Sequence, residues 1–187
     1  MFSVYNITMR KALFLCLSAA LYSGDMTQPR YSASGALVRP EGYRQWIFVG
    51  ANYGMGYTEG DAKAQAKPST FHNVYIQREA YALYGKTGRF PDKTMLVMEV
   101  VRPGTNASIN RRGMFQDEYV GIEVALKDES RFDGKWAYFN FIGAEGKPLA
   151  ESKPFAKEAC WSCHNQHGAV DNVFVQFYPV LRAARPK

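Results

Sequence analysis

The sequence predicts a mainly β domain, an antiparallel sheet with short helices. Hydrophobic residues make up 47% of the 187 residues and aromatic residues 14%, a composition that allows one proper core and suits a β-rich one. Between residues 120 and 127, Val, Ile, Val and Leu alternate with Gly, Glu, Ala and Lys, the pattern of a strand that buries one face. No apolar run reaches about 18 residues, so we expect no membrane-spanning segment.

The remaining elements are expected in an order typical of an antiparallel sheet. The run 94–101 is apolar and β-branched, and 77–84 suits a helix that ends at Gly85 and Gly88. Residues 50–68, rich in Gly and Ala, are expected to form a mobile loop. In chain order, we expect a short helical turn at 43–46 that leads into an apolar stretch to residue 50, then strand 70–76, helix 77–84, strand 94–101, strand 120–127 and strand 136–142.

The amino end has the pattern of an export signal. Arg10 and Lys11 precede a mainly apolar stretch of about ten residues that is followed by small residues. We therefore expect a signal peptide over 1–20, with a boundary as late as 24, and a periplasmic protein that has lost Cys16. A buried amino-terminal helix is the alternative interpretation. The domain itself is expected over 40–184, with 185–187 as a tail.

The charge distribution does not favour nucleic-acid binding. The chain has 23 basic and 17 acidic residues, a net charge of +6. Its basic residues are scattered, whereas a nucleic-acid interface needs a concentrated stripe. We expect no nucleic acid and no membrane among the partners.

The segment Cys160, Trp161, Ser162, Cys163 and His164 is the motif that indicates chemistry. Two thiols three positions apart can each bond a vinyl group of one haem, and the adjacent histidine can bind its iron. A redox-active thiol pair is one alternative, although such a pair normally opens a helix after an early strand. A zinc site is another, but a second pair of ligands is missing. The motif predicts haem c, covalently attached, one per chain.

The group opposite His164 decides what such a haem does, because an open position permits ligand chemistry and a sixth ligand makes an electron carrier. His167 is too close to His164 in sequence to reach the far face. His72 is expected mid-strand, where a histidine is more often structural. Met98 shares a strand face with Leu96 and Val100, so this face either packs in the core or covers the haem.

Nine segments along the chain together resemble one known family. They are FHNVYI at 71–76, AY at 80–81, KTGRFPD at 86–92, YVG at 119–121, KD at 127–128, RF at 131–132, WAYF at 136–139, CWSCH at 160–164 and VFVQFYP at 173–179. In this order they resemble the cytochrome P-460 family, which includes cytochrome c′-beta, and the resemblance covers roughly residues 40 to 184. It implies a homodimer of antiparallel β subunits, one covalent haem each, His164 as the proximal ligand and no strong protein ligand opposite. Family enzymes oxidise hydroxylamine, and the c′-beta proteins bind nitric oxide.

Two positions differ from the enzymes of that family. Met98 stands where the resemblance places a lysine that is joined covalently to the haem, so we expect no cross-link. Phe155 falls at the distal position that can carry a carboxylate base, with Glu151 and Glu158 nearby. Phe71 and His72 are also expected to border the distal pocket.

Three functions remain open from the sequence. The first is an oxidoreductase that acts on hydroxylamine, or a peroxidase-like enzyme that uses hydrogen peroxide, with a c-type cytochrome as electron acceptor. The second is a protein that binds or scavenges nitric oxide. The third is an electron-transfer cytochrome with Met98 as sixth ligand. A carboxylate opposite His164 would favour the first, a ring of phenylalanines the second and a bound thioether the third.

Overall fold

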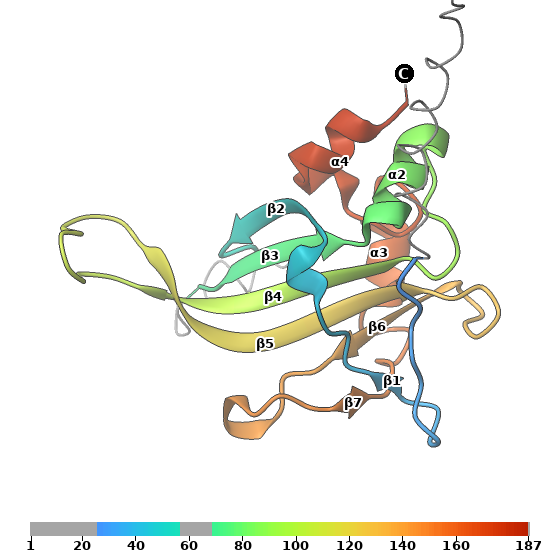
Figure 1. Ribbon diagram of the computed structural model, residues 1–187, viewed down its shortest axis with the longest axis horizontal. Helices are drawn as coiled ribbons and strands as arrows, with labels where there is room; N and C mark the ends of the chain where they lie inside the picture. Colours follow the sequence, from blue (N-terminus) through green and yellow to red (C-terminus); the bar gives the residue numbers. More distant parts are fainter. Residues whose placement is uncertain (1–25, 57–68, 187) are drawn as a thin grey trace, which may run out of the picture.

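The computed structural model describes residues 26–56 and 69–186, and its main element is a five-stranded antiparallel sheet (Figure 1). The mainly antiparallel β fold predicted from the sequence is therefore confirmed. The predicted signal peptide, residues 1–20, lies outside the described part. In spatial order the sheet contains β2 (Ile47–Tyr53), β3 (Phe71–Ile76), β4 (Met95–Gly104), β5 (Phe115–Lys127) and β6 (Trp136–Asn140).

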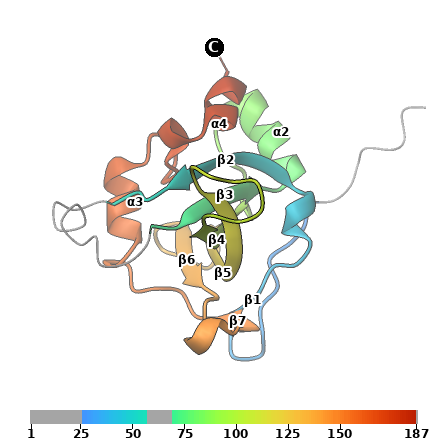
Figure 2. The same ribbon diagram turned by 90° about the vertical axis from the view of Figure 1, so that its left-hand side faces the viewer.

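Short helices and a small second sheet surround this sheet (Figures 1 and 2). α2, α3 and α4 gather around one end of it, and the two-stranded sheet lies below β6 in both views. None of the described helices is long and apolar enough to cross a membrane. The remaining elements are β1 (Leu37–Val38), η1 (Tyr43–Gln45), α2 (Arg78–Thr87), η2 (Ala144–Gly146), β7 (Glu151–Ser152), α3 (Trp161–His167), η3 (Val175–Phe177) and α4 (Pro179–Ala184).

Strand 120–127 buries one face, as predicted, and is partly covered on the other: Ile122, Val124 and Leu126 are buried, whereas Glu123 and Ala125 are half-buried. On one face, Ile122 and Leu126 of β5 pack in a core that also contains Leu37 of β1. On the other face, Ala125 packs against a second core, beneath α2, α4 and the carboxyl-terminal segment. Alternation showed which residues share a face, but it could not show that helices from elsewhere in the chain cover the more polar face.

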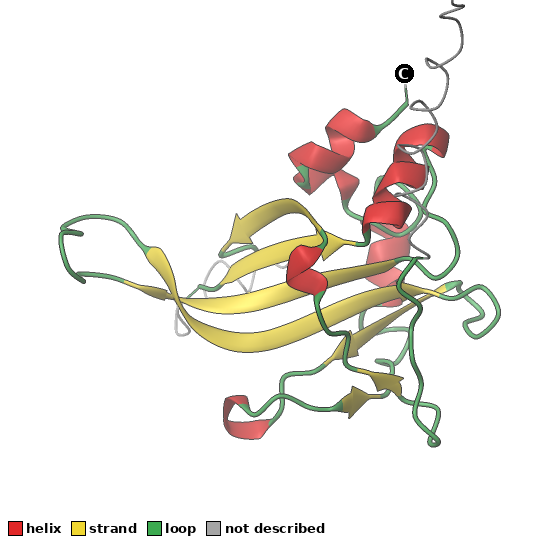
Figure 3. Ribbon diagram, viewed as in Figure 1, coloured by secondary structure: helices red, strands yellow, loops and turns green. Residues whose placement is uncertain are grey.

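Several element boundaries differ from the sequence prediction (Figure 3): β4 extends to Gly104, β5 begins at Phe115 and β6 ends at Asn140. The helix α2 continues through Gly85 and ends at Thr87, with Gly88 as a left-handed cap at φ 71°. Strand β2 continues past Gly50, where its pairing with β3 shifts register, so the loop predicted over 50–68 does not begin at residue 50. Residues 57–68 of that loop lie outside the described part. Gly50 has φ 154°, and a Cβ there would lie 3.3 Å from Tyr178 and Pro179.

The buried face of β5 provides a test of the core. Ile122 is fully buried, whereas Ile109, on the β4–β5 hairpin, is 92% exposed. Because a buried isoleucine leaves a cavity when truncated, Ile122→Ala is expected to lower the free energy of unfolding by about 2–5 kcal/mol. The same substitution at Ile109 is expected to change it by less than about 0.5 kcal/mol. Urea denaturation of both variants at equal haem content measures the difference, and equal losses would contradict the assignment of this core.

Candidate haem site

The motif segment is anchored to the sheet through its tryptophan. Cys160 caps the amino end of α3, and Trp161 is the first residue of this short helix. The Trp161 indole Nε1 donates a hydrogen bond to the Gly134 carbonyl at 3.0 Å. A Cβ on Gly134 would lie 2.3 Å from that indole nitrogen, so only glycine allows this close approach. The β5–β6 connection therefore fixes the start of the helix that carries the two thiols and His164.

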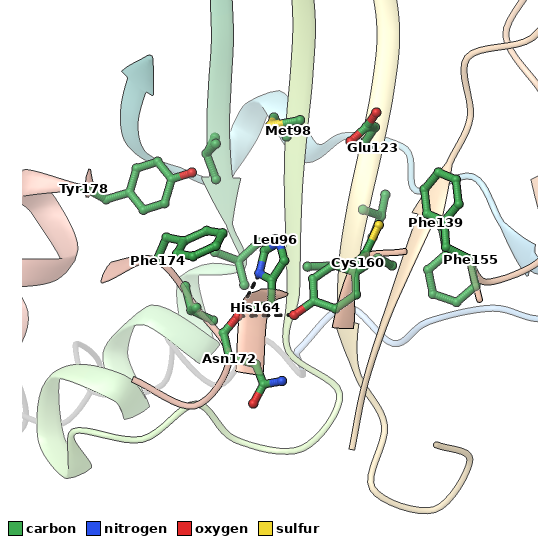
Figure 4. A pocket seen from close by; sticks show the side chains of 15 residues that line it. Leu96, Met98, Glu123, Phe139, Phe155, Cys160, His164, Asn172, Phe174 and Tyr178 are labelled. Carbon is green, nitrogen blue, oxygen red and sulfur yellow. Dashed lines mark hydrogen bonds between the residues drawn. The ribbon is translucent and has the colours of Figure 1, made fainter. Parts of the chain in front are cut away.

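His164 presents one defined nitrogen for ligation. Its Nδ1 lies 2.9 Å from the backbone carbonyl oxygen of Asn172 (Figure 4). A carbonyl only accepts, so Nδ1 carries the proton and Nε2 keeps its lone pair free for a metal. The rings of Tyr138 and Phe174 lie 4.1 and 4.4 Å from the imidazole, centroid to centroid. Burial lowers the pKa of His164, which favours the neutral, ligating form.

A hollow lies beside His164, between the sheet and the carboxyl-terminal segment. It contains about 610 Å³ of empty space, part of which is open solvent. Its walls are mainly apolar, with aromatic side chains from the sheet and from the carboxyl-terminal segment (Figure 4). The lining residues are Val74, Leu96, Met98, Glu123, Val124, Ala125, Tyr138, Phe139, Phe155, Cys160, His164, Asn172, Val173, Phe174 and Tyr178.

The hollow brings together four of the residues that the sequence singled out: Met98, Phe155, Cys160 and His164. Cys163 does not line it but packs, with Cys160, against the adjoining core. Met98 comes from β4, and Phe155, 40% exposed, from the segment after β7. Residues separated by more than 50 positions in the chain thus meet around the histidine.

Phe71 and His72 do not line this hollow, contrary to the prediction. His72 shares the face of β3 with Val74 but lies one pair farther along, opposite Val100, and its Nε2 is 3.0 Å from the Thr70 hydroxyl. Burial lowers the pKa of His72. Phe71 has the opposite parity along the strand, so it points to the other face of the sheet, where its ring packs 4.6 Å from that of Tyr53.

Glu123 is the residue of the hollow that sequence reasoning missed. It lies directly opposite Met98 in the β4–β5 pairing, so the two side chains are neighbours on one face (Figure 4). Burial raises the pKa of the Glu123 carboxyl, and burial together with Glu123 raises the pKa of the Cys160 thiol. The carboxylates proposed from sequence, Glu151 and Glu158, are exposed and do not line the hollow. The alternation of residues 120–127 puts Glu123 on the more polar face of the strand, so the sequence pattern predicted a solvent-exposed side chain.

The donor set fits a haem of the c type. The thiols of Cys160 and Cys163 are free, and they lie three positions apart at the start of α3, on one side of the helix. Among residues 26–56 and 69–186, no three or more His, Cys, Asp or Glu side chains are grouped so that they could hold a metal ion. His164 Nε2 provides a ligand for the iron, and the hollow beside it provides the apolar surroundings that a haem needs.

An imidazole next to two unpaired thiols, beside an apolar hollow on an antiparallel sheet, is the arrangement expected of a c-type cytochrome. The cytochrome P460 family model matches residues 40–175, and the chain belongs to this family. It is accordingly a haem c cytochrome of the P460 and c′-beta kind. A comparison with curated proteins found no matching sequence.

Proposed function

We propose that the protein is a periplasmic mono-haem c-type oxidoreductase that acts on small nitrogen species, by hydroxylamine oxidation or by peroxidase-like chemistry, without a haem–lysine cross-link. The observation that carries this proposal is the Glu123 carboxyl, which shares an apolar hollow with His164. A half-buried acid with a raised pKa is better matched to proton transfer near neutral pH than an exposed one.

Each residue of the hollow has a distinct task in this proposal. Cys160 and Cys163 hold one haem covalently, and His164 Nε2 binds its iron. Haem, when bound, supplies an iron that accepts and passes on single electrons. Each electron that leaves hydroxylamine is accompanied by a proton: Glu123 takes the proton and releases it to solvent before the next one, and a separate oxidised c-type cytochrome takes the electron. The surrounding apolar side chains exclude water from the reacting molecule.

Nitric oxide binding is the second candidate function. Three phenylalanines, Phe139, Phe155 and Phe174, line the same hollow. A neutral diatomic molecule binds well in an apolar site of this kind, where charged or hydrated species are disfavoured. Electron transfer with Met98 bound to iron is the third candidate, since the Met98 thioether also lines the hollow.

Stopped-flow spectroscopy of the holoprotein distinguishes these functions. Hydroxylamine with an oxidised c-type cytochrome, and separately hydrogen peroxide with a one-electron donor, are expected to be consumed over many cycles. A nitrosyl complex that forms with nitric oxide and persists, without turnover of either substrate, would favour the binding protein. A haem that binds none of the three molecules would contradict both and favour electron transfer.

Met98 gives a prediction for the missing cross-link. A thioether has no N–H and cannot bond the haem edge as an amine does, but Met98→Lys places an amine at this point of the hollow. After oxidative maturation with peroxide, we expect the lysine variant to develop a broad, red-shifted reduced Soret band that the wild type lacks. Lys93, which lies in the turn before β4 with its ammonium bonded to Asp128, is already present and serves as the internal control. An ordinary c-type spectrum in the variant would count against the alignment of Met98 with the cross-linking lysine.

Export and assembly belong to the same proposal. Haem c attachment outside the cytoplasm agrees with the signal pattern in residues 1–20, and we expect a homodimer in solution, as the family resemblance implies. Sedimentation of the holoprotein purified from the periplasm tests both expectations together: a cytoplasmic protein without haem, or a monomer at micromolar concentration, would contradict them.

A further inference from the structure

The carbonyl that contacts His164 belongs to a turn with unusual backbone geometry. Val170 and Val173 close the turn, with Val173 N donating to Val170 O at 2.8 Å. The two central residues, Asp171 and Asn172, have φ values of 48° and 61°. L residues rarely adopt this left-handed region, although Asp and Asn tolerate it best. A conformation that costs free energy persists where surrounding contacts fix it, so these contacts indicate what the turn is for.

The turn directs one carbonyl at the histidine. The Asn172 oxygen accepts from His164 Nδ1 at 2.9 Å and from the Tyr138 hydroxyl at 3.2 Å. Gly168, just after α3, allows the close approach, because a Cβ there would lie 2.8 Å from the Asn172 carbonyl carbon. The helix that carries His164 and the turn that contacts it are therefore packed directly together.

A buried lysine at the end of β5 fixes the turn to the sheet. The Lys127 side chain is 8% exposed, and its ammonium donates to Asp171 Oδ2 at 2.7 Å and to the Phe90 carbonyl at 2.8 Å. Trp136 Nε1, at the start of β6, donates to the other Asp171 oxygen at 3.2 Å. Both oxygens of Asp171 are thus held by the sheet, one residue before the carbonyl that contacts His164.

We propose that Lys127 and Asp171 are positioning residues that keep the Asn172 carbonyl on His164 Nδ1 and thereby set how strongly His164 donates electrons to the haem iron. The inference rests on the proposed ligation of haem by His164. A buried ion pair adds little net stability compared with apolar side chains of the same shape. Stability alone therefore does not explain the ion pair between Lys127 and Asp171. When a carbonyl accepts a hydrogen bond from Nδ1 of a ligating histidine, the basicity of Nε2, which binds the metal, increases. Stronger donation favours ferric iron and lowers the reduction potential.

The Lys127→Met variant separates positioning from simple electrostatics. Removing a cation near the haem lowers the reduction potential by Coulomb's law, whereas releasing the carbonyl from His164 raises it. We expect the potential of the holoprotein to rise and the iron–histidine stretching frequency of the ferrous form, measured by resonance Raman spectroscopy, to fall. Lys135→Met is the matched control: this lysine is 60% exposed and lies 3.6 Å from Glu129, which also lies 3.4 Å from Lys127, so the variant removes a cation from the same cluster but leaves the contact between Lys127 and Asp171 in place. It is expected to leave the stretching frequency unchanged.

A second variant covers the case in which Lys127→Met does not fold. Asp171→Asn removes the carboxylate but keeps a residue that tolerates the left-handed turn, and it is expected to lower the stretching frequency as well. An unchanged frequency in the folded variants, or a lowered potential in Lys127→Met, would overturn the positioning role. A wild-type protein without an iron–histidine band would instead contradict ligation by His164, and so the proposed function.

Discussion

The double variant Cys160→Ala/Cys163→Ala is expected to release its entire haem into acidified acetone, whereas the wild type releases none. The expectation follows from two free thiols at one end of α3, beside the hollow that contains His164. Thioether bonds survive acid and organic solvent, and axial ligation through His164 alone does not. Absorbance of the organic and aqueous phases measures the partition directly.

Single variants and a neighbouring control sharpen this result. When only one cysteine is replaced, the other still forms one thioether bond to the haem. Each single variant should therefore keep its haem in the aqueous phase, with an altered pyridine haemochrome band. Ser162→Ala, inside the same motif but without a thiol, is expected to behave as the wild type. Haem that stays with the protein when both cysteines are absent would disprove attachment at Cys160 and Cys163.

Glu123→Gln is expected to slow the oxidation of hydroxylamine by about a hundredfold to ten-thousandfold, the usual contribution of a positioned acid or base. Glutamine keeps the shape of the side chain beside Met98, but it cannot accept a proton. The absorption spectrum and the haem content should stay unchanged, because Glu123 neither attaches the haem nor ligates iron in this account. Glu158→Gln, an exposed glutamate near the motif, is the matched control and should keep the wild-type rate.

The pH dependence of this rate follows from the raised pKa of Glu123. Only the ionised carboxylate accepts a proton, so the wild-type rate should fall as the pH drops through a pKa above the ordinary glutamate value. The Cys160 thiol, Tyr138, Tyr178 and His164 face the same hollow, but Cys160 loses its proton when it bonds the haem. In Glu123→Gln the acid limb should disappear. An acid limb that persists in this variant would assign the titration to another group.

The arrangement of the strands was largely predictable, because alternation and β-branched runs report local structure. Strands at 70–76, 94–101 and 120–127 appear within a few residues of the expected positions. Partial burial of the second face of β5 was not predictable, since it depends on α2, α4 and the carboxyl-terminal segment folding back over the sheet. The same limit hid the role of Lys127, whose partner Asp171 lies 44 residues away along the chain.

The site was predictable where residues are contiguous and not where distant strands meet. Cys160, Cys163 and His164 form a local motif, so their spacing alone indicated haem. The position of Met98 at the hollow followed from strand parity and the family resemblance. Glu123 becomes its neighbour only through the register of β4 with β5, and sequence reasoning had sought the carboxylate near Phe155. Strand parity also places Phe71 on the face of β3 opposite to His72 and Val74, so both Phe71 and His72 could not border one pocket.

The absorption spectrum of the purified holoprotein, ferric and dithionite-reduced, tests the central claim most directly. That claim is that His164 would hold a haem in the hollow that also contains Glu123 and Met98, with one coordination position of the iron left open. The account predicts a high-spin ferric spectrum and an ordinary c-type reduced Soret band, with a clear change when hydroxylamine is added. A low-spin spectrum in both oxidation states, unaffected by hydroxylamine, would show a bound sixth ligand and contradict it.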